Sequence, residues 1–233
     1  GALVVLILLA LFPFVLSAGL TGRLTALFIY VLLAAMWNAL AGYGGLVSIG
    51  QQMFFGLGAY ITIRIADLGL DPFAAIPLSA LVTAVIAFPV SLFMLKLRGG
   101  EFAIGMWVLA SITHLLVNLD PLIQGETGTS LISLNAYDAG PRRALIYWLA
   151  LAGMTATLGL LYALLRSPTG LALQAIRDSE EAAASLGVEP ARAKRVLFLL
   201  AAFGTGLAGA LWLAQATSFQ PKTYFSVQWT AYM

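Results

Sequence analysis

Long apolar runs alternate with short polar breaks along almost the whole chain. A last run starts near Phe225, after seven others that cover residues 1–18, 24–43, 46–66, 73–95, 101–119, 144–165 and 196–217. A helix that crosses a bilayer needs about 20 mainly apolar residues, and the seven complete runs are close to that length. The pattern therefore predicts an all-α, polytopic membrane bundle with at least seven embedded helical segments and no β-sheet.

The composition supports a bilayer environment. Hydrophobic residues make up 61% of the 233 residues and charged residues only 9%, whereas a typical soluble domain carries about 25% charged residues. A soluble chain of this size has too few polar groups to cover its surface, and a bilayer removes that need. The net charge of +2 is too small to favour nucleic acid, and the absence of cysteine excludes disulfides and thiolate metal sites.

The breaks between the runs are hairpin connections, and none has the composition of a linker between domains. We interpret 1–233 as a single transmembrane domain, and we expect it to be incomplete at the C-terminus because it ends in an apolar, aromatic stretch. If the polar segment 166–195 is cytoplasmic, that side holds seven basic residues (Lys96, Arg98, Arg166, Arg177, Arg192, Lys194, Arg195) and the other side five (Arg23, Arg64, Arg142, Arg143, Lys222). This excess has the direction of the positive-inside rule.

Segment 42–60, GYGGLVSIGQQMFFGLGAY, is unusually rich in glycine for a membrane helix and also contains Ser48, Gln51 and Gln52. Irregular backbone and amide side chains survive at membrane depth only inside the protein or beside water. One interpretation is a broken or kinked helix that lines a solute path, with the amides facing the protein interior. The alternative is a continuous helix whose glycines mark close helix contacts.

Segment 166–195, RSPTGLALQAIRDSEEAAASLGVEPARAKR, is too polar to span a membrane. Its pattern predicts one short amphipathic helix over 170–187, with Thr169 as the N-cap and Gly187 just after the C-terminus. Pro190 suits the first turn of the following helix. The segment lies between two spans, so the helix should lie across the cytoplasmic face of the bundle.

The two faces of this predicted helix differ in character. Ala172, Ile176, Ala183 and Leu186 form a short apolar stripe, and Ile176 and Leu186 are its expected anchors against a partner. Arg177 is expected to pair with acidic residues three and four positions later, Glu180 and Glu181. The alternative is a surface hairpin without a function.

Other motifs do not indicate catalysis. Gly204 to Gly209 matches GxGxxG, but a dinucleotide fingerprint needs a preceding strand and an opening helix, and this match lies inside an apolar run. We assign it to helix packing, because small residues four apart let helices approach closely. The sequence contains no Walker A motif and no catalytic cluster, so we expect a non-enzymatic chain without a bound cofactor.

Several ordered motifs resemble the branched-chain amino acid ABC-transporter permease family, of the LivH/LivM type and closest to LivM. Residues 38–60, NALAGYGGLVSIGQQMFFGLGAY, resemble its signature N-L-x-x-G-x-x-G-x-x-S-x-G-x-x-x-F-x-G-x-G-A-Y. Leu97-Arg98-Gly99 with Phe102-Ala103-Ile104 resembles its R-G-x-Y-F-A-I element, and residues 201–211 its A-G-L-A-G-A-L helix. Two positions depart from the family pattern, because Gln51 replaces its histidine and Glu126 replaces a glycine.

The resemblance implies a heteromeric importer in the bacterial cytoplasmic membrane. Its expected partners are a second permease subunit, two ATPase subunits that bind ATP and Mg, and an extracytoplasmic solute-binding protein. The expected translocation path contains Asn38, Gly44, Ser48, Gln51 and Gln52. The expected ATPase-coupling helix contains Gln174, Ile176, Arg177, Asp178, Glu180, Glu181, Leu186 and Gly187.

The nature of the solute stays open at this point. Branched-chain or related amino acids fit the resemblance, and urea or other short amides are the nearest alternatives within the importer class. A secondary transporter or channel is a further alternative, although such proteins often place ionisable residues at mid-membrane. No predicted span has a central Asp, Glu or Lys.

Overall fold

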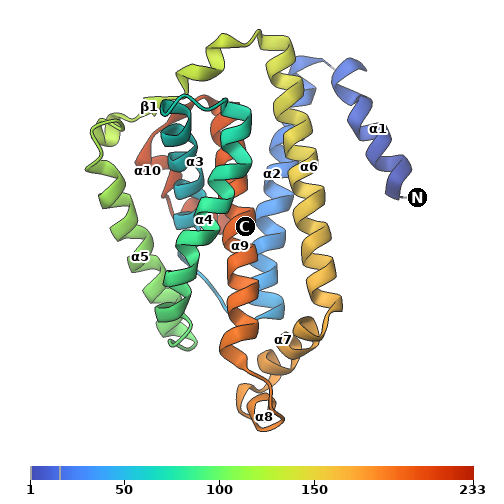
Figure 1. Ribbon diagram of the computed structural model, residues 1–233, viewed down its shortest axis with the longest axis vertical. Coiled ribbons are helices and arrows are strands. Elements are labelled where there is room, and N and C mark those ends of the chain that lie inside the picture. The colour runs from blue at the N-terminus through green and yellow to red at the C-terminus, as the bar shows by residue number, and fades with distance from the viewer. Residues whose placement is uncertain (1, 16) are drawn as a thin grey trace.

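The computed structural model describes residues 2–15 and 17–233, and helices dominate it (Figure 1). In the described part, five helical stretches are long and apolar enough to cross a membrane: α2 (Ala18–Asn38) with its extension η1 (Ala39–Tyr43), α4 (Pro72–Met94), α5 (Gly100–Asn118), α6 (Ala139–Arg166) and α9 (Pro190–Ala216). The shorter helices are α1 (Ala2–Val15), α3 (Gln52–Asp67), η2 (Gly125–Thr127), η3 (Ile132–Ala136), α7 (Pro168–Asp178), α8 (Glu180–Ser185), α10 (Pro221–Tyr224) and α11 (Gln228–Tyr232).

These helices confirm the all-α membrane bundle and refine the predicted runs. Run 1–18 gives α1, with 14 residues, and run 46–66 gives α3, with 16 residues. At 1.5 Å per residue, α3 is about 24 Å long, which is shorter than the ~30 Å hydrocarbon core. The residues that follow Phe225 form only the short α11.

Prolines and a polar cap set the starts of several helices. Pro72, Pro168 and Pro190 stand in the first turns of α4, α7 and α9, where a missing N–H costs nothing. Asp71 caps α4, because its Oδ1 accepts hydrogen bonds from two backbone N–H groups, at 2.8 and 3.2 Å. The predicted position of Pro190 is confirmed.

Helix α9 is the centre of the bundle (Figure 1). It packs against α2, α3, α4 and α6. Its most apolar 18-residue window is 72% buried, compared with 33% for each of α4, α5 and α6. Most of the surface of α9 therefore meets other helices, whereas α4, α5 and α6 turn more of their surface outward.

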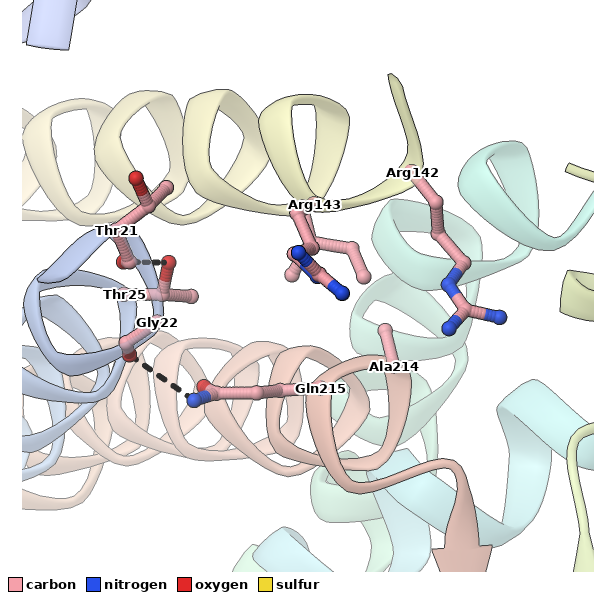
Figure 2. Close-up of a pocket in the computed structure, with 8 residues that line it drawn as sticks. Thr21, Gly22, Thr25, Arg142, Arg143, Ala214 and Gln215 are labelled. Carbon is pink, nitrogen blue, oxygen red and sulfur yellow. Dashed lines mark hydrogen bonds between the residues drawn. The ribbon is translucent and has the colours of Figure 1, made fainter. Parts of the chain in front are cut away.

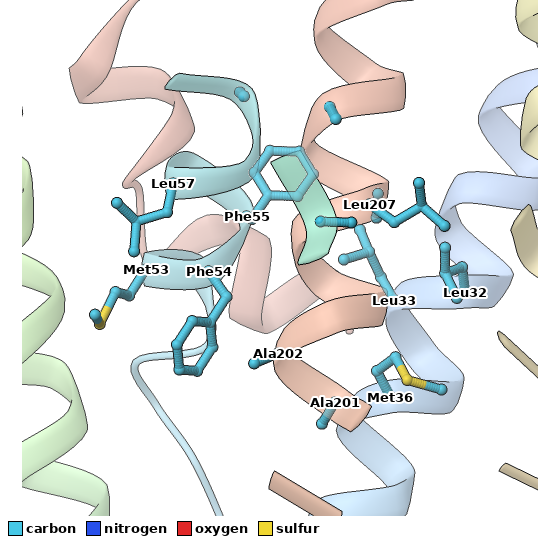
Figure 3. Packing of buried hydrophobic residues seen from close by; sticks show 14 of the residues in the cluster. Leu32, Leu33, Met36, Met53, Phe54, Phe55, Leu57, Ala201, Ala202 and Leu207 are labelled. Carbon is cyan, nitrogen blue, oxygen red and sulfur yellow. The ribbon is translucent and has the colours of Figure 1, made fainter. Parts of the chain in front are cut away.

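Glycines allow α3 to lie directly on α9, and large apolar side chains from α2 and α3 fill the space around them (Figure 3). A Cβ added to Gly58 would lie 2.0 Å from the carbonyl oxygen of Gly206, and one added to Gly209 would lie 1.9 Å from that of Phe55. Only hydrogen fits at these contacts. The assignment of the GxGxxG match to helix packing is therefore confirmed.

One small sheet corrects the prediction that the chain has none. Strand β1 (Thr129–Ser130) pairs antiparallel with β2 (Ser218–Phe219), with Thr129 opposite Phe219. The chain leaving α9 passes the connection between α5 and α6, and this pairing satisfies backbone groups that no helix there can satisfy. Leu131 N–H extends the contact to the Thr217 carbonyl at 2.8 Å.

Candidate functional site

The glycine-rich segment is an interrupted span. Helix α2 ends in η1, a single turn of π-helix, which is a feature often found at functional sites. Gly45 then adopts φ +65°, in the left-handed region that favours glycine. Residues 44–51 run from the lower end of α2 in the view of Figure 1 to the start of α3, which lies partway along the bundle. The predicted interruption is confirmed, although Gly58 also fulfils the alternative interpretation of glycines at close contacts.

Three polar residues of this segment are buried, as predicted. Ser48, Gln51 and Gln52 are 0%, 0% and 1% exposed. The Gln51 amide nitrogen donates a hydrogen bond to Thr205 Oγ1 on α9 at 3.1 Å. The Gln52 Oε1 accepts one from the Thr230 hydroxyl at 2.5 Å. The start of α3 is thereby tied to two other parts of the chain.

Gln51 retains an unused polar atom. Its Oε1 is buried and has no hydrogen-bond partner among the described residues. Burying an acceptor without a donor costs about 1–3 kcal/mol, and such a cost is expected at a site that receives a ligand or water. The neighbouring α3 N-terminus carries the partial positive charge of a helix end, so the two groups together suit a ligand with both a donor and a negative charge.

The other two predicted path residues behave differently. Gly44 is buried, and a Cβ there would lie 2.7 Å from the Leu197 side chain on α9. Asn38 is exposed at the end of α2, and its amide lies beside Gly42 instead of joining the buried glutamines. The structure therefore buries Gly44, Ser48, Gln51 and Gln52 in the interrupted span, each against different neighbours, and leaves Asn38 exposed.

The predicted helix over 170–187 is two helices. α7 begins at Pro168 after Ser167, not at an N-cap on Thr169, and ends at Asp178. Ser179 then takes an extended conformation, and its Oγ accepts a hydrogen bond from Ala182 N–H to cap α8. A serine before two glutamates is an N-cap signal, so this break was readable from the sequence.

Gly187 ends α8 as predicted. It has φ +85°, its N–H bonds to the Ala184 carbonyl at 3.0 Å, and Val188 N–H bonds to the Ala183 carbonyl at 3.2 Å. This pair of hydrogen bonds is the Schellman motif, which closes helices at a left-handed glycine.

The two expected apolar anchors have opposite environments. Ile176 is 3% exposed and packs in the core of this chain, so the expectation that it anchors a partner is wrong. It is buried because α7 folds back onto α9 and η1. Leu186 is 86% exposed, and Leu171, which the sequence reasoning missed, is 67% exposed. These two leucines are the exposed large apolar side chains of α7 and of the turn after α8.

The charges of the hairpin also pair differently from the prediction. Glu180 binds Lys194 of α9 at 2.8 Å, and Glu181 is exposed. Arg177 instead contacts Asp178 Oδ1 at 3.1 Å. The expected i+3 and i+4 pairs fail because Ser179 interrupts the helix on which that spacing depends. Gln174 is half-buried and Asp178 is exposed.

Arg177 joins the hairpin to the interrupted span. Its Nη1 donates a hydrogen bond of 2.9 Å to the Gly42 carbonyl in η1. The Gly45 backbone also lies against Arg177, because a Cβ there would be 3.7 Å from the Arg177 Cα. A displacement of α7 therefore acts directly on the backbone where α2 gives way to residues 44–51.

The opposite end of the bundle contains two polar clusters that the sequence reasoning did not assemble. Arg64 forms an ion pair with Asp120, whose Oδ2 also accepts a hydrogen bond from Tyr60 at 2.5 Å. These contacts fasten the end of α3 to the end of α5. Their partners lie 56 to 60 positions apart in the sequence, so no local pattern announces them.

The second cluster surrounds Glu126 in the connection between α5 and α6. His114 Nε2 lies 2.9 Å from its Oε1, Asn118 donates to the same oxygen at 2.5 Å, and Lys222 N–H donates to Oε2 at 3.1 Å. Burial raises the pKa of Glu126, but the hydrogen bond from Asn118 and the charge of His114 outweigh it and hold that pKa below its ordinary value. Glu126, which stands where the family pattern has glycine, thus joins the α5–α6 connection to α5 and to the backbone at Lys222.

A pocket at this same end was also missed (Figure 2). It lies between the first turns of α2 and α6 and the last turn of α9. Its walls are Thr21, Gly22, Thr25, Arg142, Arg143, Ile146, Ala214 and Gln215. The paired arginines were visible in the sequence, but most of their neighbours come from two distant segments, α2 and α9.

Comparison with known proteins gives this geometry a context. Two curated relatives carry the description high-affinity branched-chain amino acid transport system permease protein LivM. The one from Salmonella typhimurium is 29% identical over 94% of this chain and 58% of its own length, and the one from Escherichia coli is 30% identical over 95% and 59%. This chain therefore spans less than two-thirds of the length of either relative. No solved structure matches significantly.

The sequence model of one family, described as branched-chain amino acid transport system / permease component, matches residues 19–233. The match contains both the interrupted span and the α7–α8 hairpin, together with the central α9. The resemblance seen in the motifs and the all-α membrane bundle agree with it, and the chain belongs to this family of branched-chain amino acid transport permease components.

Proposed function

We propose that this chain is a permease subunit of an ATP-binding-cassette importer that moves branched-chain amino acids across the bacterial cytoplasmic membrane. Its proposed partners are a second permease subunit, two ATPase subunits that bind ATP and Mg, and an extracytoplasmic solute-binding protein. The observation that carries the proposal is the direct contact between the surface hairpin and the interrupted span, through Arg177 and Gly42. A permease driven by a separate ATPase needs such a connection from its surface to its interior.

The α7–α8 end is assigned to the cytoplasm. The connection between α4 and α5 lies at the same end as α7 and α8 (Figure 1). The seven basic residues counted on that side and the five on the other then follow the positive-inside direction. The Arg142–Arg143 pocket consequently faces outward.

The α7–α8 hairpin serves as the ATPase contact. Leu171 and Leu186 are strongly exposed apolar side chains in an otherwise polar hairpin, and Asp178 and Glu181 of the same hairpin are exposed as well. An apolar anchor inside a polar rim is the usual composition of a protein interface. Closure of the ATPase dimer would move this hairpin and shift the population between inward and outward states of the bundle.

The interrupted span serves as the moving part of the path. The buried amides of Gln51 and Gln52 and the start of α3 provide polar groups at membrane depth, where a discontinuous helix is a recurrent way to hold a solute. The unpaired Gln51 Oε1 can accept a hydrogen bond from an ammonium group. The partial positive charge at the N-terminal end of α3 can interact favourably with a carboxylate.

Reconstitution tests the proposal directly. The complete transporter, with both permeases, both ATPases and the binding protein, is placed in proteoliposomes. Transport of labelled leucine is then measured with ATP on the side of the membrane that the ATPase subunits face. We expect uptake that requires ATP and the binding protein, and no uptake of labelled urea. Uptake driven by an ion gradient without ATP would assign the chain to the secondary transporters, and urea uptake would change the solute.

A matched pair of variants tests the ATPase contact. Leu186→Asp places a charge on the exposed leucine of the hairpin, and Leu68→Asp does the same to a leucine that is 80% exposed at the opposite end. We expect Leu186→Asp to reduce uptake and ATPase co-purification together, because burying a carboxylate at a contact is unfavourable. Leu68→Asp should behave like the parent. Equal behaviour of the two variants would refute the docking role.

A further inference from the structure

The outward pocket has a defined position in the bundle. It stands at the end of the seam where α2, α6 and α9 all pack against one another, with a volume of about 100 Å³. That volume holds several water molecules and therefore a small polar group, but no large ligand. Because the three helices close the sides, the open direction is along the bundle axis toward the water phase.

One side of the pocket supplies positive charge. Arg143 lies in the space between α6 and α9, above Gln215, whereas the Arg142 side chain extends away from Arg143 at the edge of the pocket (Figure 2). Arg142 Nη1 makes a long contact of 3.4 Å with the Leu134 carbonyl. Among the described residues, no Asp or Glu forms an ion pair with either arginine. Two guanidinium groups without a carboxylate partner suit an anionic oxygen ligand.

The other side supplies neutral acceptors. Gln215 uses its amide nitrogen to donate to the Gly22 carbonyl at 3.0 Å, which leaves its Oε1 for a donor. The Thr21 hydroxyl donates to the Ser17 carbonyl at 3.2 Å and the Thr25 hydroxyl to the Thr21 carbonyl at 2.9 Å, so their oxygen lone pairs stay available. The local bonds therefore fix these three side chains as acceptors.

We propose that this pocket binds the zwitterionic head group of an α-amino acid at the outer face of the protein. Arg143 binds the carboxylate, Arg142 adds positive charge at the edge of the pocket, and Gln215 Oε1 with the threonine oxygens accepts hydrogen bonds from the ammonium group. The side chain of the amino acid stays outside the pocket and points toward the water phase. This proposal rests on the proposed function and names a first site for the solute, separate from the interrupted span.

The set of polar groups distinguishes this ligand from a phosphate. A free phosphate or the headgroup of an amine-free lipid would satisfy the arginines but leave the acceptors on the opposite wall without a donor. An amine without a carboxylate would meet two positive charges. Only a ligand that carries both groups uses both walls.

Binding to the full chain in phosphatidylcholine nanodiscs provides the test. Calorimetric titrations compare leucine with 4-methylpentanoate, which lacks the ammonium group, with 3-methylbutylamine, which lacks the carboxylate, and with glycerol phosphate. We expect leucine to bind most tightly. Arg143→Gln should weaken leucine binding about tenfold or more, because a hydrogen-bonded charge pair is lost. Arg143→Lys should lie between the parent and Arg143→Gln, since lysine keeps the charge but not the planar fork.

Arg23→Gln is the matched control. Arg23 is an exposed cation at the same end of α2 that does not line the pocket, and its loss should change leucine affinity less than about twofold because surface charges are screened. Equal weakening by Arg23→Gln and Arg143→Gln would reduce the effect to general surface charge and overturn the proposal. Tighter binding of glycerol phosphate than of leucine would also overturn it, in favour of a lipid site.

Uptake by the complete transporter separates this proposal from the proposed function. If the transporter takes up leucine with ATP but leucine does not bind at the pocket, the proposed head-group site is refuted and the proposed function stands. If leucine does not bind but Arg143→Gln weakens docking of the binding protein, the pocket receives a carboxylate of that protein instead, which also overturns the proposal. An inactive parent transporter would count against the proposed function, whatever the pocket binds.

Discussion

The interrupted span and the α7–α8 hairpin lie next to each other but are held in different ways. Eleven of the 16 residues of α3 are buried, whereas α7 buries three of 11 and α8 one of six. α3 owes its place to contacts with distant segments, above all with α9. The hairpin owes its shape largely to local signals, which are Pro168, the Ser179 cap and Gly187.

This difference separates two kinds of function. A segment fixed by close packing moves as a unit, because packed interfaces are not continuously deformable. A locally capped hairpin keeps its shape while its surroundings change. The hydrogen bond between Arg177 and Gly42 couples the two, so the hairpin can act on the buried segment although most of its own residues lie outside the core.

The largest expected effect comes from filling the contact between α3 and α9. Gly58→Val places a side chain 2.0 Å from a backbone oxygen, and we expect a loss of about 3 kcal/mol or more in the free energy of unfolding. Gly159→Val in α6, where a Cβ would meet nothing within 4 Å, is the control. Unfolding in mixed micelles measures both. A tolerated Gly58→Val would mean that α3 is not clamped.

A smaller loss is expected from the buried amide. Thr205→Val leaves the Gln51 amide nitrogen without its acceptor, which should cost about 1–3 kcal/mol in the free energy of unfolding. The double variant Gln51→Met, Thr205→Val removes both polar partners and should be closer to the parent in stability, while uptake in the complete transporter falls. If the double variant transports normally, Gln51 is structural only.

The cap on α4 should contribute about 1 kcal/mol and depend on pH. The hydrogen bond from Tyr137, together with two backbone N–H groups, holds the pKa of Asp71 below its usual value of 3.8. The stabilisation is therefore full above the usual value and is lost as the pH falls through the lowered one. Asp71→Ala should cost about 1 kcal/mol at neutral pH. Asp71→Asn should keep most of the cap and remove its pH dependence, as unfolding titrations can show.

The smallest change in stability is expected at the link itself. Arg177 is partly exposed, so Arg177→Gln should change the free energy of unfolding by less than about 1 kcal/mol. Leucine uptake per ATP hydrolysed should nevertheless decrease, because the contact with Gly42 is lost. Arg166→Gln, at the same end but away from the interrupted span, is the control. Equal coupling in both variants would remove Arg177 from the mechanism.

Some features of the site were predictable because their causes are local. Gly187 and Pro190 mark helix boundaries through their own backbone preferences, and the amides of Gln51 and Gln52 had to face the interior because lipid offers them no partner. Other features were not predictable. Ile176 lies on the apolar face of α7, which could pack either against a partner or against the chain's own α9. Only the fold decides between these two.

The pairings between distant segments show the same limit. Gln51 with Thr205 and Arg177 with Gly42 join positions 154 and 135 residues apart. No periodicity within either segment contains that information. The Arg142–Arg143 pocket is likewise assembled from the ends of three helices that meet only in the folded bundle.

The sequence by itself determined the membrane bundle, the burial of the amides in residues 42–60, the polar segment between two spans and the family. These follow from hydrophobicity, backbone preference and unsatisfied hydrogen bonds, which act within a few residues. The tertiary structure alone decided which glycines touch α9, which leucines of the hairpin stay exposed and which carbonyl Arg177 binds. Such contacts depend on how whole helices pack, and the physical reason is that close packing couples residues without regard to their separation along the chain.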